Sequence, residues 1–145
     1  MHIVSLEQAL DILDNSFRTV AEREAAARYF ETDPDPRAVP RLARALQDED
    51  FGVRWAASEA LAQLGVAALE EVLRALADPK RVGDPRLRES AYHMLHKGHG
   101  WPVPVGRLMV SLKGPAADLA SLEEAAHLLQ LLHTQGFGQP ASGRR

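Results

Sequence analysis

The sequence predicts an all-α fold, a short α-solenoid of about four helical hairpins stacked on one another. Three observations lead to this prediction. Residues 35–65 read as two helices joined by a short polar turn. An arginine that opens the second helix recurs as Arg23, Arg54 and Arg88, at offsets of 31 and 34 positions. Apolar residues at helical spacing recur four times in the first helix, which is typical of a repeat protein.

The hairpin at residues 35–65 has clear start and stop signals. Asp35 is suited to cap a helix that begins with Pro36, because proline lacks only an N–H that would be unpaired there. A polar turn at residues 47–50 follows, and Gly65 ends the second helix, as glycine does where the backbone must turn left-handed. The apolar stripes of the two helices are Val39, Leu42, Ala43 and Leu46, then Val53, Ala56, Ala57, Ala60, Leu61 and Leu64. The small alanines of the second stripe allow a neighbouring helix to approach closely.

The other helices are justified by the same signals. Ser5 is suited to cap the first helix, with Gln8 completing a capping box. Asp84 and Pro85 restart a helix as in the central hairpin. We expect these further helices over residues 6–13, 20–31 and 66–77, and from residue 85.

The last part of the chain departs from the repeat. Residues 97–103 contain two glycines, a tryptophan and a proline, and a fourth hairpin follows at residues 104–133. Its second helix is expected in the layer of the other second helices, with Leu122 in place of the repeated arginine. We predict one domain over residues 1–134 and a mobile tail over residues 135–145, which is rich in Gly, Gln, Pro and Ser.

Composition limits the class of protein. The 145 residues are 46% hydrophobic and 26% charged, which is typical of a globular domain. The chain has no cysteine, so disulfides, thiolate metal ligands and a thiol nucleophile are excluded. Neither a membrane helix nor a secretion signal is visible, and we expect a cytoplasmic protein without membrane association. The formal net charge of -3 argues against nucleic acid as the main partner.

Two segments of the central hairpin resemble a known repeat family. Residues 39–46 read Val-Pro-Arg-Leu-Ala-Arg-Ala-Leu, and residues 53–61 read Val-Arg-Trp-Ala-Ala-Ser-Glu-Ala-Leu. These residues resemble the HEAT-like repeats of the phycobilin-lyase type, strongly over residues 35–65 and well over residues 18–97. The resemblance implies a right-handed α-solenoid whose first helices lie outside and whose second helices line a concave face. It implies a binding surface and does not imply lyase activity.

The recurring arginines Arg23, Arg54 and Arg88 have two interpretations. They form either a basic ladder that holds an anion or a structural ladder of ion pairs. We favour the structural interpretation, because a residue that recurs in every repeat usually serves the stacking that every repeat shares. The expected partners are acids of the turns: Asp48, Asp50 and Asp84.

The histidines His93, His96 and His99 are spaced by three and form a weak candidate metal site. Glu89, one turn before His93, is the only carboxylate suited to assist them. Some HEAT-like enzymes, such as deoxyhypusine hydroxylase, bind iron through repeated His-Glu pairs, and this chain has no His-Glu dipeptide. We therefore predict no metal, no cofactor and no catalytic residues.

The helical register points to one candidate partner-binding surface. If Val53 and Ala57 face the core, the side chains of Trp55 and Glu59 face outward. In the next repeat Glu89, Tyr92 and His93 lie beside them. The predicted partner-binding surface consists of these residues: Trp55, Glu59, Glu89, Tyr92 and His93. Tryptophan and tyrosine are favoured anchors of protein interfaces. The alternative is that Trp55 simply fills the seam between repeats.

We predict a non-catalytic macromolecular binding module, a protein–protein interaction scaffold or adaptor that uses the concave face. The alternative is a small HEAT-like enzyme or a nucleic-acid-binding protein, lyase-like or DNA-glycosylase-like, that uses the same face. A groove dominated by positive charge would favour nucleic acid, and a metal on the histidines would favour an enzyme. The identity of the protein partner and the oligomeric state stay open at this point.

Overall fold

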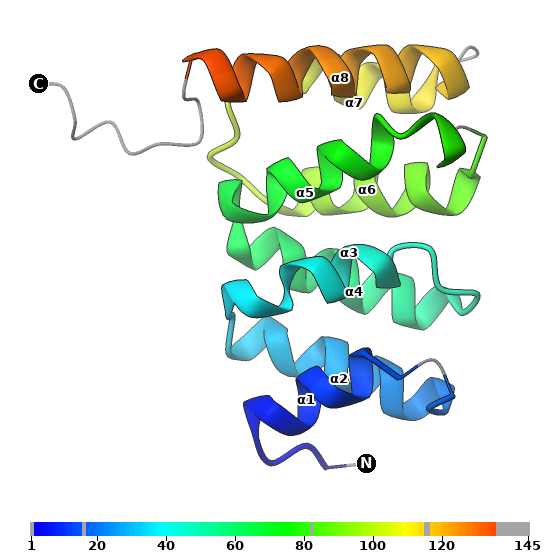
Figure 1. Cartoon of the computed structure of the whole chain (residues 1–145), viewed down its shortest axis with the longest axis vertical. Helices are drawn as coiled ribbons and strands as arrows, with labels where there is room; N and C mark the ends of the chain where they lie inside the picture. The colour runs from blue at the N-terminus through cyan, green and yellow to red at the C-terminus, as the bar shows by residue number, and fades with distance from the viewer. Residues whose placement is uncertain (1, 16, 82, 115–116, 136–145) are drawn as a thin grey trace, which may run out of the picture.

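Eight α-helices make up the computed structural model within the residues it describes, 2–15, 17–81, 83–114 and 117–135. No strand occurs in this part of the chain. The helices are α1 (Leu6–Leu13), α2 (Val20–Thr32), α3 (Val39–Ala45), α4 (Phe51–Leu64), α5 (Val66–Leu76), α6 (Pro85–Lys97), α7 (Val105–Lys113) and α8 (Ala117–Gln135). They stack along one axis as four pairs, so the predicted all-α solenoid is confirmed (Figure 1). The expected tail lies outside the described residues from residue 136 onward.

Side-chain caps start four of the α-helices and the 3-10 turn that precedes α3. Five side-chain oxygens accept a backbone N–H of the first turn: Ser5, Thr19, Asp35, Asp50 and Asp84. Thr19 forms a full capping box with Glu22 at the start of α2. At α1 the expected box is absent, because the Gln8 side chain accepts the N–H of Val4 instead of that of the cap. Side-chain caps therefore mark the starts of α1, α2, α4 and α6, whereas α3, α5 and α7 begin without one.

The start of α3 lies later than Asp35 suggests. A 3-10 turn, Pro36–Ala38, follows the cap, and the α-helix begins at Val39. Pro40 therefore falls in the first turn of α3, where its missing N–H removes no helical hydrogen bond.

The helices form two layers. The helices α1, α3 and α5 lie in one layer and α2, α4 and α6 in the other (Figure 1). Helix α4 packs between α2 and α6, and its Ala56, Ala57 and Ala60 are fully buried. The matching Ala26 of α2 and Ala91 of α6 are fully buried as well. Small side chains at these positions let three successive repeats approach closely.

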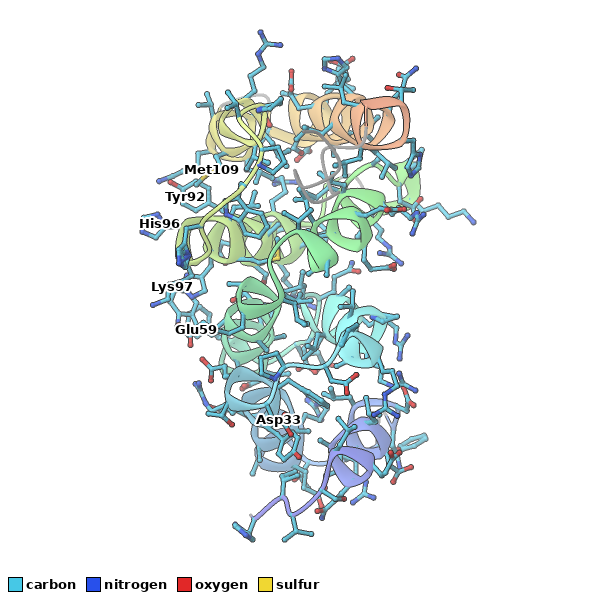
Figure 2. The ribbon with its side chains drawn as sticks, turned by 90° about the vertical axis from the view of Figure 1, so that its left-hand side faces the viewer. Asp33, Glu59, Tyr92, His96, Lys97 and Met109 are labelled. Atoms are coloured by element: carbon cyan, nitrogen blue, oxygen red, sulfur yellow. The ribbon has the colours of Figure 1, made fainter. Side chains whose placement is uncertain are left out.

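The fourth pair exchanges the two layers, which corrects the expectation that its second helix continues the layer of α2, α4 and α6. Helix α8 packs along α5, and α7 lies against α6. Figure 2 shows the same arrangement from the side, with Met109 of α7 above Tyr92 of α6. Two contacts hold α8 in this position, the ion pair Arg88–Asp118 at 2.6 Å and a hydrogen bond between His133 and Glu70 at 3.2 Å.

The connector between α6 and α7 explains the exchange. The indole N–H of Trp101 donates to the carbonyl of Leu95 at 2.9 Å, so the connector folds back over the end of α6. A Cβ on Gly98 would lie 2.4 Å from the Trp101 ring, so only glycine fits beneath it. The chain therefore stays on the side of α6 when α7 begins.

Helix α8 buries a narrower face than the sequence suggests. Ala125, Leu128 and Leu132 are buried, whereas Leu119, expected on the inner side, is 60% exposed and Ala126 is also exposed. With 19 residues α8 is the longest of the described helices, and none of these helices is long and apolar enough to cross a membrane.

The replacement Ala57→Leu should destabilise the fold by about 1–3 kcal/mol, because the added side chain has no room in a packed core. Ala57 is 0% exposed and lies on the helix that packs between two others. Urea unfolding followed by circular dichroism measures the effect. The control is Ala67→Leu on the exposed side of α5, which should leave the midpoint nearly unchanged. Equal midpoints for Ala57→Leu and the wild type would contradict the packing described.

Candidate functional site

A hollow of about 400 Å³ opens between α4, α6 and the end of α7. Phe51 and Trp55, one turn apart on α4, form one wall. Glu89, Tyr92 and neighbouring residues of α6 form the facing wall, because positions three and four apart share one face of a helix. The lining residues are Phe51, Arg54, Trp55, Glu89, Ser90, Tyr92, His93, His96 and Lys113. We call this space the α4–α6 hollow.

Trp55 and His93 join the two walls of the α4–α6 hollow. Their rings stack with centroids 3.3 Å apart and an interplanar angle of 21°. Phe51 extends the aromatic row, with its ring centroid 5.1 Å from that of Trp55. His93 is only 9% exposed beneath this cover, while Trp55 is 37% exposed and Phe51 56% exposed. Trp55 therefore both packs in the seam between two repeats and offers an open ring face.

Two cations lie over aromatic rings at the rim of the hollow. The Lys113 ammonium is 4.8 Å from the centroid of Tyr92, and the Arg54 guanidinium is 5.6 Å from that of Phe51. Tyr92 also stacks on His96, at a centroid distance of 6.1 Å. Such cation–ring contacts hold the charged groups near apolar surface without neutralising them.

A charged cluster lies directly below the hollow. Glu59 is 3.3 Å from Nε2 of His93, 3.9 Å from Nζ of Lys97 and 3.8 Å from the guanidinium of Arg28. Glu59, Tyr92, His96 and Lys97 lie on one side of the stack in Figure 2. Arg28, Glu59 and His93 occupy equivalent positions of three repeats, so the cluster runs along the stack and links α2, α4 and α6.

Burial and neighbouring charges shift three pKa values in this cluster. Burial lowers the pKa of His93, although the hydrogen bond with Glu59 acts in the opposite direction. Burial alone would raise the pKa of Glu59, but hydrogen bonds with Glu31 and His93 bring it below its usual value. Burial raises the pKa of Glu31, and the adjacent Glu59 raises it further. Of the two carboxyl groups, Glu31 therefore takes up a proton first as the pH falls.

The structure brings four of the five predicted surface residues together. Trp55, Glu89, Tyr92 and His93 line the hollow, whereas Glu59 lies below it against His93. Three other charged or aromatic residues that line the hollow were not predicted for this surface: Phe51, Lys113, and Arg54, which was assigned to the arginine ladder. The spacing of Phe51 four residues before Trp55 is the signal that would have identified it. Nothing in the repeat pattern indicates Lys113, because its position depends on the exchanged layers.

The three histidines of the candidate metal site face different neighbours. His93 contacts Trp55 and Glu59, and His96 stacks on Tyr92. His99 is exposed in the connector after α6. Within the described residues no group of three or more His, Asp or Glu side chains is placed to hold a metal ion.

The three arginines of the ladder each contact the turn or helix next to them. Arg23 makes a two-point ion pair with Asp48, at 2.8 and 3.1 Å. Arg54 donates instead to the backbone carbonyls of Asp48 and Glu49, at 2.8 and 3.1 Å. Arg88 pairs with Asp118 of α8. The expected turn acids Asp50 and Asp84 bind no ladder arginine in the described chain: they cap α4 and α6, and Asp84 also accepts from Gln47.

Comparison with known proteins gives the class of this chain. The sequence pattern of HEAT repeats matches residues 6–96, which include α1 to α5 and most of α6. The chain therefore belongs to the HEAT repeat family. No match was found among curated proteins, and none among solved structures.

Loss of the two-point pair should destabilise the fold, because it leaves the Asp48 carboxylate partly buried without its partner. We expect Arg23→Met to lower the free energy of unfolding by about 1–3 kcal/mol. Arg86→Met is the matched control, since Arg86 is an exposed residue at the start of α6. Chemical denaturation measures both variants. A midpoint for Arg23→Met equal to that of the control would show that the ladder contributes nothing to the stack.

The fold should lose stability as the pH falls from about 7.5 to 5.5. The pKa of His93 is lowered in the folded chain, so below the ordinary value of 6.5 the unfolded chain binds more protons than the folded one. The stabilisation is thus present above pH 6.5 and is lost as the pH falls below it. In His93→Gln the pH dependence should be smaller, while His127→Gln, at an exposed position of α8, should retain it. Thermal unfolding at pH 7.5 and at pH 5.5 measures the stability of each variant. If stability depends equally on pH in both variants, the assignment to His93 is contradicted.

Proposed function

We propose that this HEAT repeat protein is a protein-binding scaffold or adaptor, and that it binds its partner through the α4–α6 hollow. The observation that carries the proposal is the row of partly exposed aromatic rings, Phe51, Trp55 and Tyr92, around one concave space. HEAT repeats commonly act as interaction scaffolds, so the family agrees with this role. A cytoplasmic location is part of the proposal and rests on the absence of cysteine.

A stack of repeats offers a surface suited to binding another protein. Each repeat contacts only its neighbours, so the stack presents a long face on which adjacent helices form grooves. Aromatic side chains supply large contact area with few rotatable bonds, which is why they dominate the binding energy of interfaces. Phe51 lies on this face 56% exposed, although burial of an aromatic ring is favourable. A partner that covers the row would gain that burial.

Phe51→Ala should weaken partner binding by about tenfold or more with little loss of stability, because most of this ring is already in contact with water. The partner would be isolated on the immobilised full chain, identified, purified and titrated against each variant by surface plasmon resonance. Phe17→Ala is the matched control: the same replacement at a ring that is 95% exposed and does not line the hollow.

Trp55→Ala is the second variant. It removes more of the hollow but also uncovers His93, so we expect both weaker binding and a lower unfolding midpoint. If Phe51→Ala and Trp55→Ala both bind the isolated partner with unchanged affinity, the hollow is excluded as the binding surface.

A further inference from the structure

We infer that the α4–α6 hollow takes a partner segment in which an aromatic or long apolar side chain is flanked by carboxylates. This inference rests on the proposed function and adds the chemistry of the partner. Two features of the hollow carry it: an interior that fits an apolar side chain, and cations at the rim that form no ion pair with any carboxylate of the described residues.

The interior of the hollow fits one large apolar side chain. Its walls are the rings of Phe51, Trp55 and Tyr92. Its two most buried polar side chains already have partners, because the His93 imidazole stacks on Trp55 and contacts Glu59, and the Ser90 hydroxyl donates to the carbonyl of Leu46. A volume of about 400 Å³ holds an aromatic side chain together with part of its backbone. Rings of the wall favour an aromatic guest, since edge and offset contacts between rings add to the burial of area.

The rim of the hollow carries an excess of cations. The cations Arg54 and Lys113 line it against the single carboxylate of Glu89. Across the described ranges neither the Lys113 ammonium nor the Arg54 guanidinium forms an ion pair, because no carboxylate oxygen lies within 4.0 Å of either group. Lys113 is held over Tyr92, and Arg54 donates to backbone carbonyls. A carboxylate from a partner would pair with these cations and form charge-assisted hydrogen bonds.

The nearby acids of the chain are engaged elsewhere. Asp48 is bound by Arg23, and Asp48 and Glu49 line a different hollow, near α1 and α3. Asp50 accepts the N–H of Val53 as the cap of α4. Within the described residues none of these carboxylates forms an ion pair with Arg54 or Lys113. Glu89 remains, and it directs the acidic flank of the guest toward Arg54 and Lys113.

The distribution of charge favours a short protein segment over a nucleic acid strand. A strand of phosphates needs cations along its whole path, because each bound phosphate is neutralised separately. Below the hollow the same layer carries three carboxylates, Glu24, Glu31 and Glu59, against the two cations Arg28 and Lys97, so the excess of cations ends at the hollow. The net charge of the chain is -3, which also opposes a polyanion. An apolar side chain with one or two flanking carboxylates matches the local excess of positive charge at the rim of the hollow.

Calorimetric titration of the full chain with synthetic peptides tests the inference. The probe is Gly-Ser-Glu-Glu-Phe-Glu-Glu-Ser-Gly, and its relatives carry Gln for Glu, Lys for Glu, or Gly for Phe. A single-stranded oligothymidylate is titrated in parallel. We expect the acidic aromatic peptide to bind with a dissociation constant below about 1 mM, and each relative to bind about tenfold or more weakly. The charge reversal Lys113→Glu should weaken binding of the acidic peptide by about tenfold or more. Arg107→Glu, on the same helix but outside the hollow, should leave this binding unchanged.

The possible outcomes separate this inference from the proposed function. Preference for the Lys or Gln peptide, with binding still lost in Phe51→Ala, would overturn the inferred chemistry and leave the hollow as a protein-binding surface. Equal effects of Lys113→Glu and Arg107→Glu would overturn the role of the rim. Stronger binding of oligothymidylate than of any peptide would overturn both the inference and the proposed function. Absence of binding by every peptide would overturn the inferred chemistry alone, since the proposed function is tested on the isolated partner.

Discussion

The close contact of α4 with both α2 and α6 is the constraint on which the rest of the structure depends. It is possible because Ala56, Ala57 and Ala60 present almost no side chain between the helices, and all three are fully buried. This approach brings the ring of Trp55 on α4 into stacking distance of His93 on α6. A larger residue on the alanine face would separate the two rings. The spacing of the core thus determines both the stack and the wall of the α4–α6 hollow.

The exchange of layers in the fourth pair gives the hollow its end. In a regular continuation α8 would lie above α6, but the connector held by Trp101 keeps α7 there instead. The last residue of α7, Lys113, therefore reaches the ring of Tyr92. The α4–α6 hollow between two regular repeats is thus completed by a lysine that the repeat pattern does not contain. The same exchange lets α8 cover α5, so that the apolar end of the stack is closed.

Most of the fold could be predicted from the sequence, because its signals are local. Caps, proline at helix starts and apolar spacing each act within a few residues, and they locate all eight helices. The order of α7 and α8 could not be predicted, since it depends on how Trp101 packs on the end of α6. The site residues Trp55 and Tyr92 could be predicted, because helical register alone determines which face of the helix they occupy. Lys113 could not be predicted, because the fold and not the register brings it to the hollow.

Site-specific photocrosslinking in the source cell tests the central claim most directly, namely that the α4–α6 hollow is the surface that meets a partner protein. A photoreactive phenylalanine analogue would replace Phe51, which is exposed at the hollow, or Phe17, which is exposed away from it. We expect one dominant crosslinked protein from position 51 and none of that species from position 17. The same crosslinked protein from both positions, or from position 17 alone, would contradict the account.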